Sequence, residues 1–144
     1  MKRSDWNLLI LAAAGQRGLT PVQFQKTLFL LGKHFQQEVE AEEPFYDFQP
    51  YNYGVFDADV YCDAEKMQPA GLTKVQDSGS GYKQYYAAPA GMERAHQLSA
   101  ALPGRVTENV NELVKWAQSL SFSQLVQAVY TSYPETKANS IFKG

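Results

Sequence analysis

This sequence of 144 residues has a single cysteine, Cys62, and no long apolar run. One thiol cannot form an internal disulfide, and it gives none of the cysteine spacings typical of a zinc site. No stretch approaches the roughly 20 apolar residues that a membrane-spanning helix requires. The apolar stretch near the N-terminus is short and is interrupted by Asp5, which favours an amphipathic helix over a signal peptide. We therefore expect a soluble protein with a reduced thiol, located in the cytoplasm.

Basic residues are missing from one long segment. Between His34 and Lys66 there is no lysine, arginine or histidine, whereas nine of the fifteen carboxylates lie there. These nine are Glu38, Glu40, Glu42, Glu43, Asp47, Asp57, Asp59, Asp63 and Glu65. Such a run is usually a solvated face, and the alternative is a docking surface for a basic partner protein. In either case it repels phosphates, and a formal charge of −2 adds no attraction to nucleic acid or to an anionic membrane.

The strongest helix signal begins at Thr20. Thr20 is a good N-cap, Pro21 suits the first helical position and Gln23 can complete a capping box. Apolar residues then recur at helical spacing, which predicts a buried central helix. They are Phe24, Leu28, Leu31 and Phe35. A shorter helix capped by Asp5 is predicted before it, from Trp6 to about Gly15.

The acidic segment itself reads as loop, strand, turn and helix. Residues 36–43 are polar and predict a loop. Residues 45–51 contain strand formers, but Pro50 restricts them to a short or edge strand. A turn is expected at residues 53–54, followed by a helix over residues 57–68 with Asp57 as its cap.

Two strands, residues 72–77 and 82–87, flank a Ser/Gly turn and predict a β-hairpin. The order helix, short strand, helix, hairpin is the layout of a winged helix-turn-helix domain. We thus predict a helix-dominated α+β fold, one domain over residues 1–144, with a winged-helix core over residues 1–102. A C-terminal helical extension over residues 103–144 is expected to pack on this core or on a second copy of the chain, which leaves a homodimer open.

The candidate binding residues follow from this layout. The helix at the position of a DNA-reading helix is acidic, so we expect it to contact a basic protein surface, together with two neighbouring tyrosines. These interaction candidates are Asp57, Asp59, Asp63, Glu65, Tyr51 and Tyr53. In the alternative, a DNA-binding regulator would use the wing or the basic start of the chain. The candidates for that role are Lys2, Arg3, Arg17, Lys74 and Lys83.

No catalytic, cofactor or metal site is predicted, and we do not expect an enzyme. Asp59 and Asp63 share a helix face, but acid–base or metal chemistry would need burial and further ligands. His34 and His96 are far apart in sequence and belong to no motif. Cys62 has acidic neighbours, which disfavour a nucleophile, and we expect it as a small residue at the edge of the core.

Several stretches resemble a known family. QFQKTLFLLGKHF, FYDFQPYNYGVF, the helix ending MQPAGL and the late VYTSYPETKANS are similar to the YwgA-like winged-helix proteins, and more distantly to the Panacea domain of SocA-type antitoxins. The family often has Gly-Pro-Phe where this chain has Gly54-Val55-Phe56. The resemblance implies a small winged-helix protein without catalytic residues. Antitoxin-type members act by holding a protein partner, so an antitoxin-like or defence-associated interaction protein is the expected function.

Overall fold

The computed structural model describes residues 1–138 and Ser140. The fold is α+β and dominated by helices, as expected. The α-helices are α1 (Arg3–Ala14), α2 (Pro21–His34), α3 (Gln36–Val39), α4 (Asp59–Lys66), α5 (Pro89–Ala100), α6 (Gly104–Ser119) and α7 (Phe122–Ser132). Two 3₁₀ turns are η1 (Gly15–Arg17) and η2 (Pro134–Lys137). The strands form two antiparallel hairpins, β1 (Gln49–Tyr51) with β2 (Gly54–Phe56), and β3 (Thr73–Asp77) with β4 (Lys83–Ala87).

The start of α2 confirms the predicted capping box. The Gln23 N–H donates to the Thr20 hydroxyl at 3.3 Å, and the Thr20 N–H donates to the Gln23 side chain at 3.0 Å. The prediction for α1 was wrong in its cap, because the helix begins earlier, with Lys2 as N-cap. Asp5 instead lies in the first turn, where its carboxylate accepts the Lys2 N–H at 2.9 Å. The helix gains this extra turn because Asp5 reaches back to its start.

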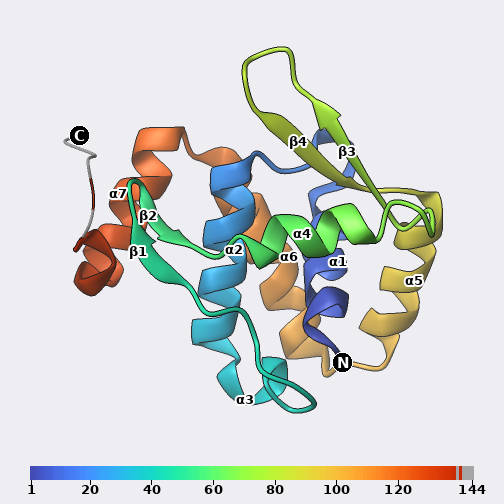
Figure 1. Cartoon of the computed structure of the whole chain (residues 1–144). Coiled ribbons are helices and arrows are strands. Elements are labelled where there is room, and N and C mark those ends of the chain that lie inside the picture. Colours follow the sequence, from blue (N-terminus) through green and yellow to red (C-terminus); the bar gives the residue numbers. More distant parts are fainter. Residues whose placement is uncertain (139, 141–144) are drawn as a thin grey trace.

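The core is built around α2, with α1 and α6 packed against it. In Figure 1 the central α2 and α1 stand side by side, and α6 runs behind them. Large side chains from each helix are fully enclosed, including Trp6, Phe24, Leu28 and Val106. The C-terminal helices therefore pack on the same chain, one of the two arrangements that the sequence left open.

The β3–β4 hairpin projects from one end of the helices (Figure 1) and is tied to the segment between α1 and α2. The Leu19 N–H donates to the Tyr85 carbonyl at 2.8 Å, and the Tyr85 N–H donates to the Leu19 carbonyl at 2.9 Å. This bridge adds Leu19 to the hairpin as a third, one-residue strand. Both predicted strands are confirmed to within one residue at their starts.

The acidic segment is more ordered than its sequence suggests. The predicted loop over residues 36–43 contains the short helix α3, whose Val39 is fully buried. Strand β1 covers only the end of the predicted strand, and it pairs with an unpredicted strand β2. The turn therefore lies at Asn52 and Tyr53, and Gly54 begins β2.

Helix α4 is shorter than predicted, and one face prediction was wrong. The prediction of Asp57 as the cap was wrong, because the N-cap is Ala58. Asp57 lies one residue before it, and its Oδ1 accepts the Asp59 N–H at 2.9 Å. Cys62 is exposed and not at the core edge. The inward positions belong to Val60, Asp63 and Ala64, since these residues share the face that packs on α1 and β3.

Candidate interaction surface

The inward carboxylate of α4, Asp63, is held by α1 and not offered to a partner. Asp63 is 9% exposed. The Arg3 guanidinium donates from Nε to its Oδ2 at 3.0 Å and from Nη2 to the neighbouring Asp59 at 3.2 Å. The Tyr46 hydroxyl donates to the same Asp63 oxygen at 2.6 Å. The Asn7 amide in turn donates to the Tyr46 hydroxyl and to the Val60 carbonyl, both at 3.0 Å.

This network gives Asp63 of the acidic helix a structural role in place of the predicted contact to a partner. Burial, followed by the hydrogen bond and charge of Asp63, raises the pKa of Tyr46 far above its ordinary value, so the phenol keeps its proton. The phenol and the guanidinium together satisfy both Asp63 oxygens. Asp63 therefore anchors α4 to α1 and to the segment before β1.

Most other carboxylates of the acidic run also have partners within the chain. Glu38 pairs with Arg105, Glu42 with the N-terminal amine, Asp59 with Arg3 and Glu65 with Lys83. Backbone N–H groups or amides bind Glu43, Asp47 and Asp57. Among the described residues, Glu40 is the one carboxylate of this run that forms no hydrogen bond or ion pair.

The basic candidates for DNA binding are scattered and largely engaged. Arg3 lies in the network above, and Lys83 pairs with Glu65 at 3.4 Å. Arg17 donates to the Gln118 carbonyl at 3.3 Å. Lys74 lies over the Tyr86 ring, with its Nζ 5.7 Å from the ring centroid. Lys2 is exposed at the start of α1.

The two tyrosine candidates, by contrast, lie on the surface of the β1–β2 hairpin. Tyr51 is 54% exposed and Tyr53 is 42% exposed. Tyr51 packs on Phe56 across the hairpin, and Tyr53 packs edge-on against Phe122 at the start of α7. Four aromatic rings thus line this edge of the molecule.

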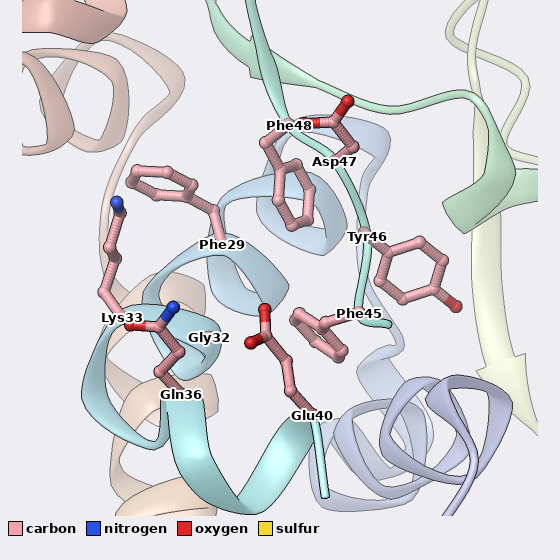
Figure 2. A pocket seen from close by; sticks show the side chains of 9 residues that line it. All are labelled: Phe29, Gly32, Lys33, Gln36, Glu40, Phe45, Tyr46, Asp47 and Phe48. Atoms are coloured by element: carbon pink, nitrogen blue, oxygen red, sulfur yellow. The ribbon is translucent and has the colours of Figure 1, made fainter. Parts of the chain in front are cut away.

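A hollow of about 200 Å³ lies on the α2–α3 side of the same segment. Figure 2 shows its walls: Phe29 and Gly32 from α2, and Phe45, Tyr46 and Phe48 from the chain leading into β1. We call it the aromatic pocket. The rings of Phe29 and Phe48 meet edge to face at 5.7 Å, and those of Phe45 and Phe48 lie 6.5 Å apart. Gly32 leaves space here, because a Cβ at this position would lie 3.1 Å from the Phe45 ring.

Three charged side chains line the aromatic pocket: Glu40, Asp47, whose carboxylate accepts the Gln49 amide, and Lys33. The Glu40 side chain rises from the end of α3, and Figure 2 shows the carboxylate directed into the space between Phe45 and Gln36. Lys33 lies at the rim, where its Nζ is 5.4 Å from the Phe29 ring centroid and 5.7 Å from that of Tyr133. Aromatic faces and a carboxylate without an internal partner form an environment suited to a cation.

A second hollow, of about 170 Å³, lies beneath the β1–β2 hairpin. Tyr51 and Tyr53 line it, together with Tyr61 from α4 and Lys26 from α2. Burial raises the pKa of Tyr61 to about 12, so this phenol is neutral at physiological pH. The sequence thus identified two residues of this hollow and missed Lys26.

A helical-wheel signal for Lys26 does exist in the sequence. Lys26 has Val22 four residues before it, and Phe29 and Leu30 three and four residues after it, so it shares a face with apolar residues. Glu40 has no comparable signal, because nothing local distinguishes it from the other carboxylates of the run.

Neither a metal centre nor a membrane span is found in the part of the chain that the structure describes. No group of three or more His, Cys, Asp or Glu residues is placed to hold a metal ion. No helix there is both long enough and apolar enough to cross a bilayer.

Compared with models of known protein families, with curated proteins and with solved structures, the chain matches none of them. The functional proposal therefore depends on the geometry of the aromatic pocket and its surroundings.

Proposed function

We propose that this chain is a non-catalytic winged-helix protein that binds a partner protein through a basic segment of that partner. The aromatic pocket is the proposed contact. A lysine or arginine side chain of the partner would enter it, with the charged head beside Glu40 and the aliphatic stem against Phe45 and Phe48. The proposal places the protein in the cytoplasm, as expected from its composition.

The observation that carries this proposal is the position of Glu40. Eight of the nine carboxylates of the acidic run have partners inside the chain, and the ninth is directed into an aromatic hollow. A cation over an aromatic ring is worth about 0.5–2 kcal/mol depending on its desolvation. A carboxylate beside it adds a charge-assisted hydrogen bond. Arginine and lysine are the protein side chains that satisfy both.

The winged-helix part of the proposal is supported by the order of contacts. α1, the Leu19 bridge strand, α2, α4 and the β3–β4 hairpin follow one another as in a winged helix, with the bridge strand paired to the last hairpin strand. The resemblance to YwgA-like proteins, and more distantly to the Panacea domain of SocA-type antitoxins, favours the same layout. It also favours an antitoxin-like or defence-associated role, since such antitoxins hold a protein partner.

The alternative, a DNA-binding regulator, has weaker support. In a winged helix α4 would approach the DNA, and it presents Asp59 and Glu65. Two cations, Arg3 and Lys83, are paired with these same carboxylates. A gel-shift titration with mixed genomic fragments at low salt tests this alternative, and a shift below micromolar protein would favour it over the partner protein.

A charge-reversal pair tests the proposed contact. Glu40→Lys should abolish capture of the partner, whereas Glu112→Lys should leave it unchanged. Glu112 is an exposed residue of α6 and makes no hydrogen bond or ion pair within the described residues, so it is a matched control for net charge. Both variants should melt at the temperature of the native protein, because both side chains are exposed.

The measurement has two stages. Proteins captured by the native chain, by Glu40→Lys and by Glu112→Lys are first compared quantitatively. A protein that the native chain and Glu112→Lys capture but Glu40→Lys does not is then purified. Its dissociation constant for Glu40→Gln should be at least tenfold larger than for the native chain. If the partner protein bound the native chain and Glu40→Gln with equal affinity, the aromatic pocket would not be its binding site.

A further inference from the structure

The amine of Lys26 lies inside the protein without a counter-ion. Lys26 is 2% exposed, and within the described residues its Nζ forms no hydrogen bond or ion pair. Burial of an ammonium group is costly unless the group is paired. Desolvation lowers the pKa of Lys26 from 10.5 to about 8, with no opposing contribution from a nearby charge. The amine is therefore still largely protonated at pH 7.

The space beside this amine is the hollow beneath the β1–β2 hairpin. Its walls are the rings of Tyr51, Tyr53, Phe56 and Tyr61. Gly54 packs closely against the amine, because a Cβ at this position would lie 2.9 Å from the Lys26 Nζ. The φ of Gly54 is +110°, a conformation that only glycine adopts readily, so both the backbone and the contact require this residue.

Two other polar side chains of the hollow already have partners, Gln25 and Tyr61. The Gln25 amide donates to the Asp57 carbonyl at 2.9 Å and accepts the Asp57 N–H at 3.0 Å. The Tyr61 hydroxyl donates to the Pro21 carbonyl at 3.2 Å. Lys26 is the one ammonium group that lines the hollow, and no acceptor for it is in place among the described residues.

We propose that this hollow binds a small aromatic carboxylate, whose carboxylate pairs with the Lys26 ammonium and whose ring packs among Tyr51, Phe56 and Tyr61. The size fits: the hollow measures about 170 Å³, and a protein cavity of about 150 Å³ holds one benzene molecule. A single acidic group is expected because a single cation is available. A phosphate would bring a second negative charge and no apolar surface for the four rings.

The site is separate from the aromatic pocket. Lys26 lies one helical turn before Phe29 on α2, and Phe29 is the nearest residue of α2 that lines the aromatic pocket. Binding of the proposed ligand is thus a second function of the chain, independent of binding to the partner protein.

The affinity should fall as pH rises, because the deprotonated amine cannot pair with a carboxylate. The titratable groups that face Lys26 from the packed elements are phenols: Tyr51 and Tyr53 on the hairpin, Tyr61 on α4 and Tyr130 on α7, whose Cε1 lies 3.5 Å from the Gly54 Cβ position. Burial raises the pKa of Tyr61 to about 12, so this phenol stays neutral between pH 7 and 9. Above pH 8 the affinity should therefore weaken about tenfold per pH unit, until the pKa of Lys26 in the complex is reached.

Titration with benzoate tests the proposal. At pH 7 the native protein should bind it with a dissociation constant of about 1 mM, as expected for one ring and one charge. Benzamide, the neutral analogue, and inorganic phosphate should each bind at least tenfold more weakly. Lys26→Met should lose at least tenfold in affinity, whereas Lys115→Met, an exposed lysine of α6, should retain it.

Circular dichroism verifies that Lys26→Met is folded, so a loss of binding cannot be assigned to unfolding. Saturable binding at pH 7 that is lost in Lys26→Met and weakened at pH 9 supports the site. Equal affinity of benzoate for the native chain and Lys26→Met would overturn it. So would the absence of saturable binding up to about 20 mM benzoate, or phosphate binding as tightly as benzoate.

Discussion

Replacing Lys26 with methionine measures directly how strongly the interior disfavours this charge. Lowering the pKa from 10.5 to about 8 corresponds to about 3 kcal/mol of lost stability while the amine is charged, since one pKa unit is about 1.36 kcal/mol. Methionine has a similar length and no charge. At pH 7 we therefore expect Lys26→Met to be more stable than the native protein by about 3 kcal/mol.

The pH dependence of the stability gained by Lys26→Met distinguishes removal of the buried charge from a change in packing. Between pH 8 and 10.5 the unfolded chain holds a proton on Lys26 that the folded protein has lost, so native stability rises with pH. The gain from Lys26→Met should shrink to below about 1 kcal/mol at pH 10. Tyrosine ionisation near pH 10 lowers the stability of both proteins and cancels in the comparison.

Urea unfolding followed by far-UV circular dichroism at pH 7, 8.5 and 10 is the assay. Lys115→Met is the control and should change stability by less than about 0.5 kcal/mol at each pH. A gain for Lys26→Met that is the same at pH 7 and pH 10, or no gain at all, would show that Lys26 is not a buried, unpaired cation.

Two further predictions concern contacts that hold the fold together. Asp63→Asn should destabilise the protein by about 2 kcal/mol, because it leaves the Arg3 guanidinium without its buried carboxylate. Asp59→Asn, which removes the more exposed carboxylate bound by Arg3, should cost less than about 0.5 kcal/mol. Thermal unfolding measures both. Gly91→Ala should destabilise α5 by more than about 2 kcal/mol despite alanine's higher helix propensity, since the new Cβ would overlap the Leu72 carbonyl oxygen. Gly104→Ala, where no atom lies within 4 Å of the new Cβ, should be neutral or stabilising, and an equal effect at both glycines would contradict the packing argument.

Local signals in the sequence predicted local structure well. The capping box at Thr20 is confirmed, because its donor and acceptor lie three residues apart. The β3–β4 hairpin is likewise confirmed around its Ser/Gly turn. These features depend on neighbours in the chain, so periodicity and turn chemistry are sufficient to find them.

The roles of the charged residues could not be read in the same way. Asp63 has the sequence pattern of an exposed acidic helix, and its burial depends on Arg3, sixty residues earlier. Cys62 is exposed because Asp63 takes the inward position. The importance of Glu40 appears only after the partners of the other eight carboxylates are known, which requires the folded structure.

The central claim is that the aromatic pocket holds a cationic side chain. The most direct measurement is a titration of the ¹⁵N-labelled protein with N-acetyl-arginine methylamide, with N-acetyl-norleucine methylamide as the neutral control. We predict saturable shifts of the amide signals of Gly32, Glu40 and Phe48 with the arginine compound alone, and their loss in Glu40→Gln. Shifts that persist in Glu40→Gln, or no saturable shift up to about 50 mM, the weak limit for so small a ligand, would contradict it.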